Sequence, residues 1–190
     1  MTKQIRVIQK RRRREGRTNY HKRIKMLLGK TPRVIIRLST NTVVIQLAKF
    51  NEKGDAILAA VNSIVLEQHG WKFKKNNLPS CYLTGLLLGK KAKELGITQA
   101  IADIGLHTSI KGSKIYAVIK GLLDAGLSIP VSKDILPSDD RIQGKHIAAY
   151  FAQNKVKPNN EQQFHAYKQQ QLAAENISVS FNELKKKIMG

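Results

Sequence analysis

Positive charge is concentrated at the beginning of this chain, and this concentration limits where a folded core can start. Residues 1–37 contain 14 of the 34 lysine and arginine residues but only one acid, Glu15. A segment with so much charge of one sign repels itself and buries too little apolar surface to fold alone, which is typical of an arm that orders on a polyanion. We therefore predict a basic arm over residues 1–32 and a folded core that begins after it.

The remainder of the chain is apolar enough to form that core. Hydrophobic residues make up 42% of the 190 residues and aromatic residues only 6%, so we expect a mainly aliphatic core. No apolar run approaches the roughly 20 residues that a membrane-spanning helix needs, so we expect no such span. The aliphatic runs are residues 34–38, 43–48, 57–66, 83–88 and 115–123.

The core is expected to start with three strands. The segment Val43–Leu47 is β-branched at first and then alternates between apolar and polar residues, which is typical of a sheet strand. Short polar segments at Ser39–Asn41 and Asn51–Asp55 separate the strands, so we expect an antiparallel meander. The three strands are predicted over residues 33–38, 42–50 and 56–61.

Two amphipathic helices with a short strand between them are expected next. Pro79 marks the start of the first helix, because proline is favoured at the first helical position, and Gly96 marks its end. Ser113 is expected to cap the second helix, whose apolar stripe ends before Gly126. The strand between the helices is predicted over residues 99–104. This order of elements after a meander predicts an α/β fold built from layers.

The composition changes to Gln, Asn and Lys from about residue 153 onward. Before this change, Ser138–Asp140 is expected to start a helix, with acids placed to favour the helix dipole. After it, we expect a Gln-rich helix over about residues 161–175 and a last helix that the capping box Ser180–Glu183 begins. The predicted organisation is therefore a basic arm (1–32), an α/β core (33–152) and a C-terminal helical extension (153–190).

The net charge of +21 and the isoelectric point near 10.3 indicate an anionic partner, either nucleic acid or an anionic membrane surface. Arginines can pair with phosphate oxygens in a bidentate manner, and Tyr20 can stack on a base or contact a sugar. A nuclear-localisation tract, a solvated basic tail and a mitochondrial transit peptide are the alternatives, the last disfavoured because Arg11–Arg14 are consecutive. The arm residues predicted to contact RNA are Arg11, Arg12, Arg13, Arg14, Arg17, Thr18, Tyr20, Lys22 and Arg23.

The first strand and two loops extend the predicted RNA-binding surface. Arg33 and Arg37 lie four residues apart and share one face of the strand, which would make that face of the sheet basic. Ser39 and Asn41 add hydrogen-bonding groups in the turn that follows. Lys111 precedes a predicted helix N-terminus, where free backbone N–H groups favour phosphate. An ordinary exposed strand and a plain connecting loop are the alternatives at these positions.

The sequence offers little for catalysis, so we expect neither an enzyme nor a cofactor. The five histidines have no metal-ligand spacing, and Cys81 is the one cysteine, which fits a reducing, cytoplasmic compartment. Residues 85–91 resemble a P-loop only superficially, because the glycine spacing is one residue short and Lys91 stands where Ser or Thr is needed. Asp103 is the best candidate for metal-dependent nuclease chemistry, but the sequence shows no carboxylate to partner it.

Several motifs of the chain, taken together and in order, resemble one known family. Examples are Tyr-Leu-Thr-Gly-Leu-Leu-Leu-Gly at 82–89 and Asp-Ile-Gly-Leu at 103–106. With the further motifs they resemble the L-eighteen family of large-subunit ribosomal proteins, in the archaeal and eukaryotic branch whose eukaryotic member is known as L-five. The resemblance runs collinearly over about residues 11–152. The further motifs lie at 11–23, 30–39, 124–130 and 141–148.

This resemblance implies a protein that binds 5S rRNA and helps attach it to the large, 23S-type rRNA in the central protuberance. The ribosomal protein called L-five in bacteria and archaea would lie nearby. The implied fold is a ribonuclease-H-like, three-layer mixed sheet without the catalytic carboxylates of that fold. The resemblance implies RNA contacts at residues 11–23, Arg33, Arg37, Ser39 and Asn41, and it adds Arg141. It implies no membrane and no small-molecule substrate; a nucleic-acid-processing enzyme and a membrane-surface protein remain the two alternatives.

Overall fold

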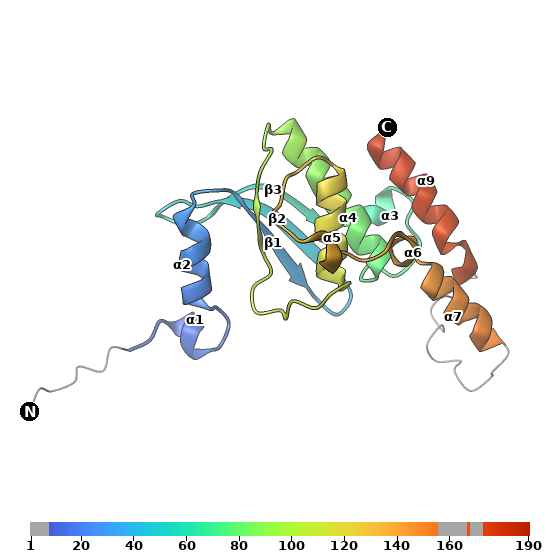
Figure 1. Ribbon diagram of the computed structural model, residues 1–190, viewed down its shortest axis with the longest axis horizontal. Coiled ribbons are helices and arrows are strands. Elements are labelled where there is room, and N and C mark those ends of the chain that lie inside the picture. The colour runs from blue at the N-terminus through green and yellow to red at the C-terminus, as the bar shows by residue number, and fades with distance from the viewer. Residues whose placement is uncertain (1–7, 156–166, 168–172) are drawn as a thin grey trace, which may run out of the picture.

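The computed structural model describes residues 8–155, 167 and 173–190, which form a mixed α/β fold (Figure 1). Helices and strands follow one another as short elements, and 3₁₀ helices are written η. In chain order the elements are α1 (Arg11–Arg14), α2 (Tyr20–Leu28), β1 (Arg33–Leu38), β2 (Val43–Lys49), β3 (Ala56–Asn62), α3 (Val65–Gln68), α4 (Leu78–Glu94), β4 (Ile101–Asp103), α5 (Lys114–Asp124), η1 (Lys133–Ile135), α6 (Asp139–Ile142), α7 (Lys145–Lys155), η3 (Ala174–Asn176) and α9 (Ile177–Met189).

The sheet that the described residues form has four strands in the order β3-β2-β1-β4. The first three strands pair antiparallel, with Ile36 opposite Ile45 and Ile45 opposite Val61, so the predicted meander is confirmed. β4 pairs parallel to β1, which places Asp103 beside Ile35 and makes the sheet mixed. The α/β class expected from the sequence is therefore confirmed.

One face of the sheet packs against α4 and α5. Alternate residues of β1 and β2 on this face, among them Val34, Ile36, Ile45 and Leu47, have no exposed surface and belong to the main hydrophobic core. Side chains alternate between the two faces of a strand, so the residues between them point to the other face. This alternation sends Arg33 and Arg37 away from the core, as the sequence predicts.

Helices α4 and α5 touch each other backbone to backbone. A Cβ atom at Gly85 would lie 2.3 Å from the carbonyl oxygen of Val118, and one at Gly121 would lie 2.2 Å from that of Tyr82. Both distances are shorter than the contact distance between non-bonded atoms, so glycine is required at both positions for this close approach. The sequence prediction that the glycines of residues 85–91 serve helix packing, and not a P-loop, is confirmed because this segment lies inside α4.

The arm lies on the other face of the sheet, and here the structure differs from the sequence prediction. The charge pattern predicts a segment without structure of its own, whereas α1 and α2 are helical and α2 stands beside the sheet on the side away from α5 (Figure 1). Asn19 begins α2, and its side-chain oxygen accepts a hydrogen bond from the backbone nitrogen of Lys22 at 3.1 Å. No side chain of α2 is fully buried, and of its apolar residues Met26 and Leu27 are partly buried, so this helix has little apolar burial to fix it.

The C-terminal part of the chain departs from the prediction at two points. The helix expected after Ser138 is divided into α6 and α7, because Gly144 between them has a φ of 80°. The capping box predicted at Ser180 is wrong, because α9 already begins at Ile177 and Ser180 lies in its first turn. The Gln-rich helix predicted over 161–175 falls mostly outside the described residues.

Helix α9 packs on the core instead of extending away from it. Its apolar residues belong to the hydrophobic core, and the ring of Phe181 lies 5.5 Å from that of Tyr82 in α4. The ammonium group of Lys90 donates a hydrogen bond to the carbonyl oxygen of Ile188 at 3.0 Å. The helical side of the molecule thus consists of α4, α5 and α9. The buried residues of α9 are Ile177, Phe181, Leu184 and Ile188.

Candidate nucleic-acid interface

The cations of the arm are held in place by hydrogen bonds and ion pairs within the arm. The Nε atom of Arg12 donates a hydrogen bond to the hydroxyl of Thr18 at 2.9 Å. Glu15 forms ion pairs with Arg11 at 3.5 Å and Arg17 at 3.2 Å. Both arginines of these pairs stay largely exposed, with about 70% of each side chain accessible (75% and 68%). The arm therefore presents its guanidinium groups to the solvent from a folded loop.

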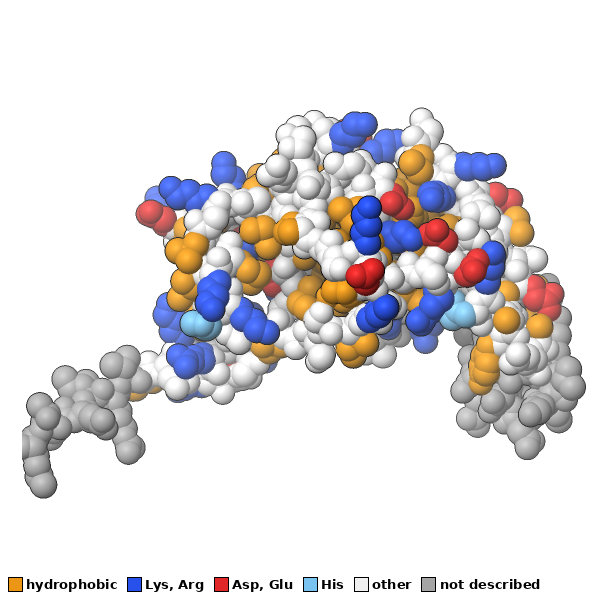
Figure 2. Space-filling model, in the orientation of Figure 1, with side chains coloured by type: hydrophobic (Ala, Val, Ile, Leu, Met, Phe, Trp, Pro, Cys, Tyr) orange, Lys and Arg blue, Asp and Glu red, His pale blue; other side chains and the backbone are white. Residues whose placement is uncertain are grey.

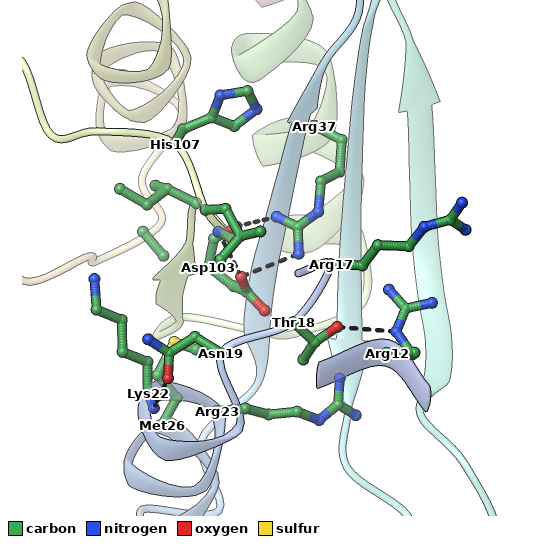
Figure 3. Close-up of a pocket in the computed structure, with 14 residues that line it drawn as sticks. Arg12, Arg17, Thr18, Asn19, Lys22, Arg23, Met26, Arg37, Asp103 and His107 are labelled. Carbon is green, nitrogen blue, oxygen red and sulfur yellow. Dashed lines mark hydrogen bonds and ion pairs between the residues drawn. The ribbon is translucent and has the colours of Figure 1, made fainter. Parts of the chain in front are cut away.

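Side chains of the arm, of β1 and of the segment after β4 line one cavity of about 410 Å³. Residues that lie far apart in the sequence meet at this cavity, and Figure 3 shows how they lie around it. Apolar side chains contribute to the same wall, among them Met26, Ala102, Ile104 and Leu106. The cavity is therefore cationic but partly apolar, which suits a phosphate with its attached nucleoside. The basic residues that line it are Arg12, Arg17, Lys22, Arg23, Arg37 and His107.

Positive side chains also gather on the outside of this region. On the face drawn in Figure 2, lysine and arginine side chains cluster over α1 and α2, whereas over α5, α6 and α9 they are interspersed with carboxylates. Examples of such compensation are the ion pairs of Lys120 with Asp139 and of Lys145 with Asp140. On this face the uncompensated positive charge therefore lies mainly at the arm.

Arg33 does not belong to the exposed surface, which corrects the sequence prediction. Only 1% of its side chain is exposed, and two carboxylates surround it. Its Nη1 donates a hydrogen bond to Oδ2 of Asp103 at 3.1 Å. Its Nη2 lies 2.7 Å from Oδ2 of Asp55, so the two groups form a close ion pair, but their relative orientation does not meet the geometry of a hydrogen bond. A buried charge is tolerated only when it is paired, so Arg33 is bound by the protein and cannot serve as a free phosphate ligand.

Arg37 and Arg23 continue this set of ion pairs to the surface. The Nη2 of Arg37 lies 3.1 Å from Oδ1 of Asp103, and its Nη1 donates to the carbonyl oxygen of Asp103 at 2.8 Å. The Nη2 of Arg23 donates to Oδ2 of Asp55 at 2.8 Å. Arg37 keeps 46% of its side chain exposed and Arg23 keeps 36%. Both therefore remain able to contact an anion while they hold their carboxylates.

The electrostatic environment of Asp55 favours its charged form. Partial burial alone would raise the pKa of this carboxyl group, but the neighbouring guanidiniums of Arg33 and Arg23 outweigh that effect. The pKa of Asp55 consequently lies below its ordinary value of 3.8. Asp55 is an anion under all physiological conditions.

Gly105 lines the cavity beside Arg37, and the sequence analysis did not predict this position as part of the site. Its φ is 65°, and a Cβ atom there would lie 3.1 Å from Cζ of Arg37. Its backbone nitrogen donates a hydrogen bond to Oδ1 of Asp103 at 2.9 Å. Asp55 and Asp103 were likewise missed as partners of the arginines, because the pairs join residues 22 to 70 positions apart. The only local signal was the motif Asp-Ile-Gly-Leu at 103–106.

The turn between β1 and β2 does not line this cavity. The hydroxyl of Ser39 donates to the carbonyl oxygen of Thr42 and accepts from its backbone nitrogen, so it closes the turn itself. The side chain of Asn76 donates to the carbonyl oxygens of Ser39 and Thr40 at 2.6 and 3.0 Å, which fixes the turn against the start of α4. Asn41 is exposed at the tip. Of the two predicted turn residues, Asn41 is thus the freer to contact RNA.

Lys111 and Arg141 form a second exposed basic site. A Cβ atom at Gly112 would lie 3.4 Å from Nη1 of Arg141, so Arg141 lies beside the loop that contains Lys111. Both Lys111 and Arg141 are exposed. Ser113 occupies the N-cap position of α5, but its side chain forms no capping hydrogen bond, contrary to the prediction. Lys111 and Arg141 do not line the cavity beside the arm.

Tyr20 is less free than its place in the arm suggests. Its side chain is partly buried, and the ammonium group of Lys10 lies 5.1 Å from the centre of its ring. This cation–π contact already covers one face of the ring. Stacking on an RNA base would use the other face or displace Lys10.

The candidate catalytic acid of the enzyme alternative already has cationic partners. Asp103, the candidate catalytic acid, is paired with Arg33 and Arg37, and within residues 8–155, 167 and 173–190 no three His, Cys, Asp or Glu side chains gather to hold a metal ion. None of the helices in that part of the chain is both long and apolar enough to cross a bilayer.

Comparison with known proteins gives a consistent result. Residues 4–99 match the family model of the ribosomal large subunit proteins 60S L5 and 50S L18. The chain is 43% identical over 181 residues to the large ribosomal subunit protein uL18 of Thermofilum pendens, with 93% of this chain and 91% of that protein covered. It is 42% identical over 178 residues to uL18 of Korarchaeum cryptofilum, with 94% and 91% covered. The similarity therefore extends over nearly the whole length of both relatives.

Proposed function

Because this chain belongs to the uL18 family of large ribosomal subunit proteins, we propose that it binds 5S rRNA through its basic arm and helps attach that RNA to the large rRNA. As a member of this family it is a structural, non-enzymatic constituent of the large ribosomal subunit. Its place there would be the central protuberance, with the bacterial and archaeal protein L-five as a neighbour. It would act by binding, without turnover.

One observation supports this proposal above the others: several cations of the arm and of β1 face one cavity beside the sheet. Arg12, Arg17 and Lys22 contribute from the arm, and Arg37 contributes from β1. RNA phosphates neutralised by such cations release counterions, and this release supplies much of the affinity of proteins for nucleic acid. A fixed set of cations also selects RNA whose phosphates have the matching spacing, which gives shape specificity.

The second basic site supports the attachment role. Lys111 and Arg141 lie apart from the arm cavity, and Asn41 is exposed at the tip of the β1–β2 turn. A protein that joins two RNA segments needs two separate cationic surfaces. We assign the arm cavity to 5S rRNA and the second site to the large rRNA.

The fold is also consistent with this role. The strand order β3-β2-β1-β4, with three antiparallel strands and β4 parallel to β1, supports the ribonuclease-H-like assignment that the sequence resemblance implies. The carboxylate of the last residue of β4, Asp103, pairs with arginines in this chain. An architecture associated with nucleic-acid chemistry would here serve binding alone.

The affinity of the full chain for 5S rRNA at several salt concentrations tests the proposal. If about 6–8 phosphates are neutralised, the logarithm of the affinity constant falls with the logarithm of the salt concentration with a slope of about −4 to −7. Deletion of residues 1–23 should abolish tight binding while the circular dichroism of the core is kept. An affinity that ignores salt, or that survives the deletion, contradicts the proposed site.

A matched pair of triple variants locates the interface. Replacement of Arg12, Arg13 and Arg14 by Gln removes three cations from the arm, and replacement of Lys91, Lys93 and Lys186 by Gln removes three exposed cations from α4 and α9. The arm variant should weaken binding by about 100-fold or more, because each lost phosphate contact reduces the affinity and the salt slope. The helix variant, with the same net charge, should change binding by about threefold or less. Equal losses would show that only net charge matters.

A further inference from the structure

We propose that Asp55 and Asp103 are positioning residues for RNA binding, because these two carboxylates hold three arginines and the arm helix in the arrangement that RNA meets. This inference rests on the proposed function. It leads to an unusual expectation: removal of a negative charge from this very basic protein should weaken its binding to a polyanion.

The two carboxylates and three arginines form one chain of alternating charge. In order it runs Arg23–Asp55–Arg33–Asp103–Arg37, and the nitrogen–oxygen distances are 2.8, 2.7, 3.1 and 3.1 Å. The chain starts in α2, passes through the residue before β3, crosses β1, reaches the end of β4 and returns to β1. It therefore ties the arm to three strands of the sheet.

Burial along this chain is highest in the middle and lowest at its ends. The exposed fractions of the side chains are 36% for Arg23, 18% for Asp55, 1% for Arg33, 7% for Asp103 and 46% for Arg37. Ion pairs are weakly screened where they are buried and strongly screened where water reaches them. The buried centre is thus the rigid part, and the two ends, Arg23 and Arg37, are two of the cations that line the arm cavity.

Helix α2 depends on this chain more than on apolar packing. None of its side chains is fully buried: Ile24 and Leu28 are 58% and 76% exposed, and Met26 and Leu27 are only partly buried. An ion pair between Arg23 and Asp55 joins α2 to the residue before β3. Without the carboxylate, the guanidiniums of Arg23 and Arg33 would repel each other and α2 would lose its anchor. The arm would then have to be ordered again when RNA binds, and ordering reduces affinity.

The experiment compares two variants of the full chain that have the same net charge. Asp55→Asn removes the carboxylate that lies between Arg23 and Arg33, with almost no change of shape. Glu52→Gln removes an exposed carboxylate from the same turn, and within the described residues Glu52 forms no ion pair. Both raise the net charge from +21 to +22. Binding to 5S rRNA is measured at several salt concentrations, and hydrogen exchange of the free proteins is measured in parallel.

We expect Asp55→Asn to weaken RNA binding by about three- to tenfold with an unchanged salt slope, because the same phosphates are still neutralised. Glu52→Gln should leave the affinity unchanged or slightly higher. In free Asp55→Asn protein the amides of α2 should exchange faster, while those of α4 and α5 stay as in the wild type. Arg12→Gln serves as the contrast, because loss of a direct phosphate contact should reduce the slope by about one. The inference is overturned if Asp55→Asn binds RNA as tightly as Glu52→Gln, or if α2 exchange does not change.

A second variant keeps the test valid if Asp55→Asn does not fold. The double variant Asp55→Asn with Arg33→Met removes the buried charge together with its partner, a change that proteins often tolerate. It should fold, lose the protection of α2 and bind RNA about three- to tenfold more weakly than the wild type. Wild-type binding would contradict the inference. If wild-type protein itself fails to bind 5S rRNA, the proposed function fails, whereas the exchange of α2 in the free proteins still decides whether the carboxylates hold the arm.

Discussion

The two faces of the sheet are covered in different ways, and the difference separates folding from binding. On one face α4 and α5 approach so closely that Gly85 and Gly121 leave no room for a side chain, and the residues beneath are aliphatic. On the other face α2 has no buried side chain and is held by ion pairs of Arg23, Asp55 and Arg33. Apolar packing is insensitive to salt and pH, whereas partly exposed ion pairs respond to both. One face therefore specifies the fold, and the other can adjust to a charged partner.

The largest effect is expected for a methyl group on the helical face. Gly121→Ala would place Cβ 2.2 Å from the carbonyl oxygen of Tyr82, so the two helices must separate. We expect a loss of about 3 kcal/mol in the free energy of unfolding, measured with urea. Gly29→Ala on the arm side is the control, because its Cβ would meet only Thr31 at 3.5 Å. A control as unstable as Gly121→Ala would remove the contrast between the faces.

The next effect concerns Asp103, which is buried on the arm side together with Arg33. Asp103→Asn leaves Arg33 with Asp55 as its remaining carboxylate and Arg37 with none. The buried charge of Arg33 then has one carboxylate fewer to compensate it, so we expect a loss of about 2 kcal/mol in the free energy of unfolding. Asp140→Asn, which removes an exposed pair with Lys145, should change it by about 0.5 kcal/mol or less. Equal losses would mean that burial does not matter here.

A smaller effect is expected for the polar pair on the helical face. The hydroxyl of Tyr82 donates a hydrogen bond to Oδ2 of Asp124 at 2.6 Å, and burial together with Asp124 raises the pKa of Tyr82, so the hydroxyl stays protonated. Tyr82→Phe should reduce the free energy of unfolding by about 1 kcal/mol and leave RNA binding unchanged. A change in RNA affinity would show that the helical face also contacts RNA.

The smallest effect is a dependence of arm docking on acid. The pKa of Asp55 lies below its ordinary value of 3.8, because Arg33 and Arg23 outweigh its burial. A lowered pKa in the folded state means that the stabilisation is fully present above pH 3.8 and is lost as the pH falls through the lower, folded-state pKa. The difference in urea stability between wild type and Asp55→Asn should therefore disappear in strong acid. A difference that stays constant into strong acid would contradict the ion pair.

The sequence predicted the helical face well, because its signals are local. Alternation around Ile36 and Ile45 and the stripe ahead of Gly126 predict strands and helices that the structure confirms. The capping pattern at Ser180 was misleading, since the same four residue types can occur inside a helix. The position of α9 on α4 had no local signal.

The arm face could be predicted only in part, because its interactions join distant residues. The period of a strand places Arg33 and Arg37 on one face, but it does not reveal that Asp55 and Asp103 cover Arg33. The charge density of the arm predicts that its cations repel one another. It does not show that carboxylates elsewhere in the chain reduce this repulsion. The cations were therefore identified correctly as a group, while the roles of single arginines needed the structure.

Hydrogen exchange of the full chain, free and bound to 5S rRNA, tests most directly whether folding and RNA binding use opposite faces. The account predicts that RNA slows exchange in α1, in α2 and in the segment after β4 that includes Gly105, and leaves α4 and α5 as they are in the free protein. Slower exchange in α4 and α5, with an arm that exchanges as fast as before, would contradict it.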